Sequence, residues 1–183
     1  FGSSENWRSI AKQLSKNYGI ICIDCRNHGD SFHHDSMTYE EMASDVIQLL
    51  NHLEISSTHI IGHSMGGKVA MTITLMFSDY IQKQIIVDIA PKSYPPHHQQ
   101  IINSLKGIRL TQYKLRSDVS EHLKTSIPDI NLRSFLLKNI QTIPGGSLKW
   151  KINLNSIANN YKTIMDWPKS MNKKESLTPT LFI

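Results

Sequence analysis

A serine flanked by glycines gives the strongest chemical signal in the sequence. The run Gly62-His63-Ser64-Met65-Gly66-Gly67 is a Gly-x-Ser-x-Gly pattern, directly after a predicted strand and directly before a predicted helix. That order is the context of a nucleophile elbow, a strained turn with positive φ that exposes the Ser64 hydroxyl above a sheet. We expect Gly62 and Gly66 to lack side chains because strand and helix approach closely there. The N–H group of Met65, at the helix start, is the predicted oxyanion donor. The alternative is a glycine-rich turn with an incidental serine.

Two further groups of residues follow predicted strands. Asp88 ends the third strand, where it could orient a catalytic imidazole near the serine or accept backbone N–H groups as an ordinary strand-end acid. Residues 24–31 follow the first strand, and loops at the carboxyl ends of parallel strands line the ligand crevice. We therefore expect Arg26 and His28, with His63 beside the nucleophile, to border a substrate pocket. For Arg26 and His28, local hydrogen bonds in a structural turn are favoured over a catalytic role.

Other site chemistries have weaker support. Cys22 and Cys25 form a C-x-x-C pattern, but Cys22 falls inside a predicted strand rather than at a helix start, so we expect buried structural cysteines. Histidines 28, 33, 34, 97 and 98 have no acid or cysteine at a convincing ligand spacing, so no metal is expected. No G-x-G-x-x-G follows the first strand, which argues against a nucleotide binder.

Composition limits the class of protein. The 183 residues are 39% hydrophobic and 19% charged, enough for one sizeable domain with a core and unlike a disordered or fibrous chain. No apolar run approaches the ~20 residues of a membrane helix. The formal net charge of +5 comes without a dense Lys/Arg block, so no nucleic-acid partner is expected.

Three Ile/Val-rich runs predict buried parallel strands, because they are nearly continuous rather than alternating. They are residues 19–24, Thr58–His63 and 83–89. Helices are predicted over residues 9–17, 38–52 and 66–77. The second of these opens with Thr38 and Glu41 at capping-box spacing. The alternation of helix and strand predicts an α/β fold with a mostly parallel sheet flanked by helices.

The pattern changes after the third strand, because all seven prolines lie beyond residue 90. Short helices are predicted over 95–105, 118–124, 132–140 and 156–165, and residues 178–183 return to strand character. We therefore expect a partial core over residues 1–89, an all-helical cap over 90–176 and a return strand of the core over 177–183.

Taken together, these motifs resemble the α/β-hydrolase-fold serine esterases, and within them the group of alpha/beta-hydrolase domain-containing protein 11 and the bacterial YbfF-type esterases. The resemblance runs through residues 1–7, 24–31, 37–46, 61–70, 87–91 and 179–183. It implies hydrolysis of small-molecule carboxylic esters or acyl thioesters through a Ser64 acyl-enzyme, with Asp88 as the acid and no cofactor. Animal members are mitochondrial and bacterial members cytoplasmic, so the resemblance implies one of these locations rather than secretion.

Departures from that family shape the expected activity. The family has a strand ending in His-Gly before the segment that starts here at Phe1, and a catalytic histidine after the strand that ends here at Ile183. None of the nine histidines present matches that position. The absent strand, expected between the first two predicted here, also carries the second oxyanion donor, worth about 2.7–4 kcal/mol. Losing the histidine costs on the order of a millionfold in turnover. We expect a fold incomplete at both termini and a chain that is inactive alone.

Two other functions stay open. A peptidase or carbon–carbon hydrolase on the same fold is compatible with the elbow, since acyl specificity resides in the cap. The alternative from another class is a non-catalytic binding or interaction protein on a hydrolase scaffold. A haloalkane dehalogenase is not, because it requires Asp where Ser64 stands. The oligomeric state is not indicated by the sequence.

Overall fold

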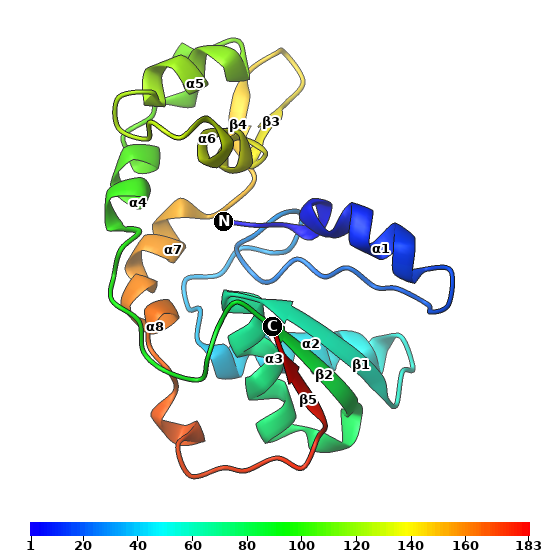
Figure 1. Cartoon of the computed structure of the whole chain (residues 1–183). Helices are drawn as coiled ribbons and strands as arrows, with labels where there is room; N and C mark the ends of the chain where they lie inside the picture. The colour runs from blue at the N-terminus through cyan, green and yellow to red at the C-terminus, as the bar shows by residue number, and fades with distance from the viewer. The chain divides into compact units, whose positions relative to one another are not determined.

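The computed structural model describes residues 1–183, which group into two compact units (Figure 1). One unit combines Phe1–Asp35 with His97–Asn159, and the other combines Ser36–Pro96 with Asn160–Ile183. We call them the first and the second unit. The predicted division into core, cap and return strand stays a prediction. No helix of the chain has the length and apolar character needed to cross a membrane.

The second unit contains a three-stranded parallel sheet in the order β1-β2-β5. Its strands are β1 (Thr58–His63), β2 (Ile81–Val87) and β5 (Thr180–Phe182). The prediction for β1 is confirmed residue for residue. β2 starts and ends two residues earlier than predicted, and β5 is shorter than its predicted run. Register pairs His63 with Val87, so β1 and β2 end at the same edge.

Two helices of this unit form as their sequences predict. α2 (Tyr39–His52) begins with the predicted capping box, in which Thr38 Oγ1 accepts the Glu41 N–H (3.2 Å) and the Glu41 carboxylate accepts the Thr38 N–H (2.9 Å). α3 (Met65–Met76) follows β1 directly and is buried over most of its length. The short η2 (Ser78–Tyr80) then leads into β2. Residues close in the sequence are therefore sufficient to predict where both helices begin, to within one residue.

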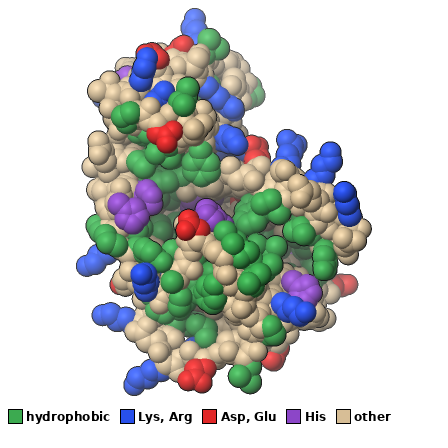
Figure 2. Space-filling view, viewed as in Figure 1, with side chains coloured by type: hydrophobic (Ala, Val, Ile, Leu, Met, Phe, Trp, Pro, Cys, Tyr) green, Lys and Arg blue, Asp and Glu red, His purple; other side chains and the backbone are tan.

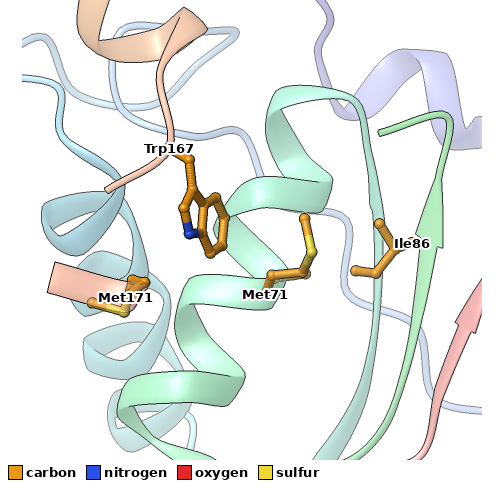
Figure 3. Close-up of a cluster of buried hydrophobic side chains, with 5 residues drawn as sticks. Met71, Ile86, Trp167 and Met171 are labelled. Atoms are coloured by element: carbon orange, nitrogen blue, oxygen red, sulfur yellow. The ribbon is translucent and has the colours of Figure 1, made fainter. Parts of the chain in front are cut away.

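A hydrophobic cluster joins α3, β2 and the end of the chain. Figure 3 shows Met71 of α3 and Ile86 of β2 with Trp167 and Met171. Ala70 completes the buried cluster. Trp167 lies between α8 (Tyr161–Met165) and the short helix η4 (Lys169–Met171), and Met171 is the last residue of η4. Burial of these side chains fixes the last stretch of chain on α3, since each large apolar side chain contributes roughly 1.5–3 kcal/mol.

Part of this sheet is not covered by the chain. Figure 2 shows hydrophobic side chains gathered over the strands of the unit. Ile61 on β1 is 37% exposed, and Leu181 and Phe182 on β5 are each 54% exposed. Strands of parallel sheets are usually covered on both faces. This sheet is therefore covered less completely than its apolar sequence predicts.

The first unit is mainly helical, with one correction to the sequence analysis. It holds η1 (Ser4–Trp7), α1 (Arg8–Leu14), α4 (Gln99–Lys106), η3 (Leu110–Gln112), α5 (Arg116–Leu123), α6 (Ile130–Leu137) and α7 (Leu154–Asn159). An antiparallel hairpin, β3 (Ile140–Thr142) and β4 (Leu148–Trp150), interrupts the region predicted to be all-helical. Its loop contains Gly145 and Gly146 at φ of 91° and 81°. Those two glycines favour a turn, so the all-helical prediction was wrong here.

Two further predictions were wrong. Residues 19–24, predicted as a strand, form no strand and belong to neither sheet. Ile20, Ile21 and Ile23 are 38%, 48% and 36% exposed, and Cys22 is exposed rather than buried. The physical reason is the same for both errors: an extended segment becomes a buried strand only when neighbours pair with its backbone and cover its faces.

Candidate active site

Ser64 stands in the strained turn that the motif predicts. Its φ and ψ are 52° and −122°, a positive-φ backbone conformation that residues other than glycine rarely adopt. The residue lies between the last residue of β1 and the first residue of α3. Its N–H donates to the Val87 carbonyl oxygen (3.0 Å), and its side chain makes no capping bond to the helix. The hydroxyl is therefore held at the end of the sheet and left available for chemistry.

The glycines around Ser64 differ in what they contribute. A Cβ at Gly62 would lie 2.2 Å from the carbonyl oxygen of Gly66, so no side chain fits between strand and helix there. A Cβ at Gly66 itself would meet nothing within 4 Å, which corrects the expectation that close approach requires glycine at this position. Gly67 takes that role, because its Cβ would lie 2.5 Å from Ile89 Cγ2.

The start of α3 supplies hydrogen-bond donors beside the serine. The Ser64 carbonyl accepts the N–H groups of Gly67 (2.9 Å) and Lys68 (3.2 Å), which closes the first turn. N–H groups ahead of that turn have no acceptor within a helix. Met65 carries the first of them, and the helix dipole adds partial positive charge. The role of Met65 as an oxyanion donor stays a prediction.

Asp88 lies at the same end of the sheet as the serine. It follows β2 directly, adopts a positive φ of 53°, and its N–H donates to the Ile183 carbonyl oxygen (2.8 Å). One carboxylate oxygen is 3.9 Å from His63 Nε2, and these side chains are 87% and 54% exposed. Because exposed ion pairs contribute little, this contact orients the two groups without holding them firmly.

The histidine nearest to Ser64 in sequence does not bond its hydroxyl. The adjacent His63 directs its imidazole toward Asp88, and no hydrogen bond of the structure joins the Ser64 hydroxyl to a histidine. The second unit thus brings nucleophile, acid and helix start together at one edge. The catalytic roles of Ser64 and Asp88 stay predictions.

Arg26 and His28 belong to the first unit, where both are buried. His28 Nδ1 is 3.1 Å from the Arg26 carbonyl oxygen, and the Arg26 guanidinium lies 5.5 Å from the centroid of the Phe32 ring. Burial, helped by the charge of the chain's amino terminus, lowers the pKa of His28 to about 3. These contacts support the structural-turn interpretation, and a role at the pocket border stays a prediction.

Asn27 is a residue of this loop that the sequence analysis missed. It is fully buried at a φ of 66°. Its side-chain amide donates to Ser156 Oγ (3.0 Å), and its side-chain oxygen accepts the N–H of His34 (2.8 Å) and the amide of Asn153 (3.2 Å). Asparagine tolerates positive φ better than most residues, so its place in a polar turn was the available signal.

Lys68 is the second residue that was missed. It is only 2% exposed, although it lies in the apolar helix α3 four positions after the serine. Its ammonium donates to the carbonyl oxygens of Met165 (3.1 Å) and Asp166 (2.7 Å). A lysine inside an otherwise apolar helical run was the signal that could have found it, because a buried lysine needs polar partners.

Comparison with known proteins shows the family of the chain. Residues 1–128 match the model of the alpha/beta hydrolase fold family. The chain is 37% identical over its whole length to the sn-1-specific diacylglycerol lipase ABHD11 of Danio rerio, of which it covers 59%. It is 32% identical to Esterase YbfF of Escherichia coli, with 92% of this chain and 65% of that protein covered. The chain therefore spans less than two thirds of the length of these curated relatives.

A solved structure is similar over nearly the whole chain. A marine microorganism esterase superposes with a TM-score of 0.95 at 40% sequence identity, covering 99% of this chain and 71% of the esterase. A second structure, E-2-(acetamidomethylene)succinate hydrolase, superposes with a TM-score of 0.71 at 17% identity and supports the fold alone. Fold and sequence similarity thus point to the same group of proteins.

Proposed function

This chain belongs to the alpha/beta hydrolase fold family, and we propose that it forms the nucleophile-bearing part of an enzyme that hydrolyses small-molecule carboxylic esters or acyl thioesters. The observation that carries the proposal is Ser64, held at positive φ between β1 and α3 with its hydroxyl uncommitted. The names of the ABHD11, YbfF and marine esterase relatives support ester hydrolysis.

The reaction follows from the groups at the end of the sheet. The Ser64 hydroxyl oxygen attacks the substrate carbonyl as a histidine takes its proton, and the N–H of Met65 donates to the oxyanion that forms. Collapse of the intermediate breaks the bond to the alcohol or thiol, which leaves with that proton. Water then attacks the acyl-enzyme by the same route and releases the carboxylic acid. Asp88 orients the histidine in this scheme.

We propose further that the 183 residues alone turn over little substrate. The support is the absence of any histidine bonded to Ser64 in the structure. A serine without its general base loses on the order of a millionfold in turnover. The relatives contain further segments that this chain does not match, and we propose that in the chimera tested below such segments supply the base and the second oxyanion donor.

The test compares two proteins in the hydrolysis of p-nitrophenyl acetate. One is the 183-residue chain, and the other is a chimera in which this chain replaces the matching 71% of the marine esterase. We expect saturable turnover by the chimera and only background hydrolysis by the chain. Ser64→Ala should abolish the turnover of the chimera.

The controls separate folding from chemistry. Ser78→Ala, at an exposed serine on η2, should leave the turnover of the chimera unchanged. Turnover that survives Ser64→Ala would overturn the assignment of the nucleophile. A folded chimera without any turnover would instead favour the non-catalytic alternative, and Ser64-dependent turnover by the chain alone would overturn the claim that its site is incomplete.

A further inference from the structure

The ammonium of Lys68 occupies a closed polar site within the second unit. Its side chain reaches from the first turn of α3 to the last carbonyl groups of α8, those of Met165 and the following Asp166. The carbonyl end of a helix carries partial negative charge, so a cation is favourable there. Lys68 thus caps one helix from the side of another.

Aromatic rings complete this site. The Lys68 ammonium lies 5.5 Å from the centroid of the Tyr39 ring and 5.1 Å from that of the Tyr94 ring, within the range of cation–π contacts. Both tyrosines also bond the same stretch of chain. The Tyr39 hydroxyl donates to the Ile164 carbonyl (2.5 Å), and the Tyr94 N–H donates to the Met165 carbonyl (2.9 Å). Three consecutive carbonyl groups are therefore held at one point.

We propose that Lys68 is a positioning residue for Ser64: its buried ammonium holds the carbonyl groups of Met165 and Asp166 against the first turn of α3 and thereby fixes the nucleophile elbow. The proposal rests on the proposed function, because it assigns Lys68 a part in the same reaction. We call Lys68, Tyr39, Tyr94 and the carbonyl groups of residues 164–166 the lysine clasp.

The link to the elbow is short and continuous. The Lys68 N–H donates to the Ser64 carbonyl, so the backbone that the clasp anchors is the backbone that closes the turn at the nucleophile. Loss of the clasp frees the first turn of α3 to shift against β1. A shift of the Met65 N–H changes stabilisation of the transition state more than binding of the substrate. The clasp should therefore act on kcat and leave KM nearly unchanged.

The charged and titratable groups that face the clasp are few. Burial lowers the pKa of Lys68 and the charge of Asp166 opposes that lowering, while the Asp166 carboxylate is also engaged by the Ser93 hydroxyl and the Trp167 N–H. These two bonds, with the charge of nearby Lys169, lower the pKa of Asp166, which is therefore ionised in neutral and basic solution. Lys92 lies 5.3 Å from the centroid of the Tyr94 ring. The phenol groups of Tyr39 and Tyr94 complete the set.

Protonation of Lys68 gives the clasp a signature of its own. Burial lowers the pKa of Lys68 from 10.5 to about 8 in the closed clasp, whereas an opened, hydrated lysine regains its ordinary value. Opening between pH 8 and 10.5 therefore takes up a proton, so opening becomes less favourable as the pH rises through this interval. Below pH 8 both states are protonated and the dependence ends.

Trp167 reports on the clasp directly, because it follows Asp166 and packs against α3 (Figure 3). In a Trp7→Phe, Trp150→Phe background it is the sole tryptophan of the chain. We expect acrylamide quenching of Trp167 in the parent to fall between pH 8 and 10, and to be about threefold greater at pH 7 in Lys68→Met. Quenching in Lys68→Met should show no such fall with pH. Lys92→Met, at an exposed lysine on the same tyrosine ring, is the matched control and should behave as the parent.

Activity of the chimera gives the second measurement. We expect Lys68→Met to lower kcat by about 10- to 100-fold with KM within about twofold, and Lys68→Arg to restore part of the loss. The proposal is overturned if Trp167 quenching in the parent is flat from pH 8 to 10, a result that needs no variant to fold. It is also overturned if Lys68→Met retains the parent's kcat. Turnover that persists in Ser64→Ala would defeat the proposed function while leaving the quenching result for the clasp intact.

Discussion

The elbow at Ser64 and the loop at Asn27 are two positive-φ turns that the chain uses in opposite ways. At Ser64, φ is 52° and the side chain makes no bond to the helix that it starts. At Asn27, φ is 66°, yet the side chain is fully buried and bonded to three other residues. Strain with a free hydroxyl is typical of a reactive site, whereas strain with a satisfied amide serves to hold a loop. The turn at Ser64 is therefore a candidate for a catalytic role, and the turn at Asn27 is a candidate for a structural role.

The largest expected effect tests how tightly the elbow is built. Gly62→Ala places a Cβ 2.2 Å from the Gly66 carbonyl oxygen, so strand and helix must separate. We expect the free energy of unfolding of the second unit to fall by more than about 4 kcal/mol. Gly66→Ala enters open space and should change it by less than about 1 kcal/mol. Urea unfolding followed by the fluorescence of Trp167 in the Trp7→Phe, Trp150→Phe background measures both, and equal losses would contradict the geometry of the elbow.

The next effect is a loss of stability at low pH, caused by His28 in the loop that contains Asn27. The pKa of His28 is lowered to about 3 in the folded chain, so below pH 6.5 the unfolded chain binds a proton that the folded chain does not. Stability should fall as the pH drops from 6.5 toward 3, by up to roughly 4 kcal/mol. Urea unfolding at several pH values, followed by the fluorescence of Trp7 and Trp150 in a Trp167→Phe background, measures this slope. His28→Asn should flatten the slope, and an unchanged slope would show that other groups control acid sensitivity.

Replacement by glycine should change the free energy of unfolding in opposite directions at the two turns. Asn27→Gly keeps the positive φ but deprives Ser156, His34 and Asn153 of their partner, so we expect a loss of about 3 kcal/mol. Ser64→Gly relieves strain without removing a bond, so stability should rise by up to about 1 kcal/mol. Denaturant midpoints of the two variants decide the matter. A loss of stability at Ser64→Gly would mean that the serine has a structural role.

The smallest effect comes from the ion pair at the edge of the Asn27 loop. Lys151 Nζ lies 2.9 Å from an Asp30 oxygen, and the hydrogen bond that the Lys151 ammonium donates to the Asp30 carboxylate raises the pKa of Lys151. Because the Asp30 side chain is 79% exposed, Asp30→Asn should cost less than about 1 kcal/mol. The cost should shrink further in 1 M salt. A larger, salt-independent loss would place this pair among the structural contacts of the loop.

Features with local causes could be predicted from the sequence. The capping box of Thr38 and Glu41, the bounds of β1 and the positive φ of Ser64 depend on residues only a few positions apart. The membership of the family could also be recognised, because its motifs are contiguous. The candidate nucleophile and acid were therefore found before their geometry was known.

Features with distant causes could not be predicted. Residues 19–24 have the composition of a strand, but pairing depends on neighbours that composition does not specify. The contacts of Asn27 with Ser156 and of Lys68 with Met165 span 129 and 97 residues. The predicted helix over residues 156–165 is broken at Asn160, between α7 and α8. Such contacts arise from tertiary packing, which overrides local preference.

The parallel pairing of β5 with β2 has a consequence for how the chain folds. Gln84 Nε2 on β2 donates to Thr180 Oγ1 on β5 across 96 residues, whereas β1 and β2 pair across about a quarter of that distance. Closing the longer loop costs roughly 4 kcal/mol of chain entropy, so β5 should dock last. Until it does, one edge of β2 offers unpaired N–H and C=O groups to any other extended chain. Refolding yield should therefore fall with protein concentration. Once β5 has paired with β2, it protects that edge of β2 from aggregation.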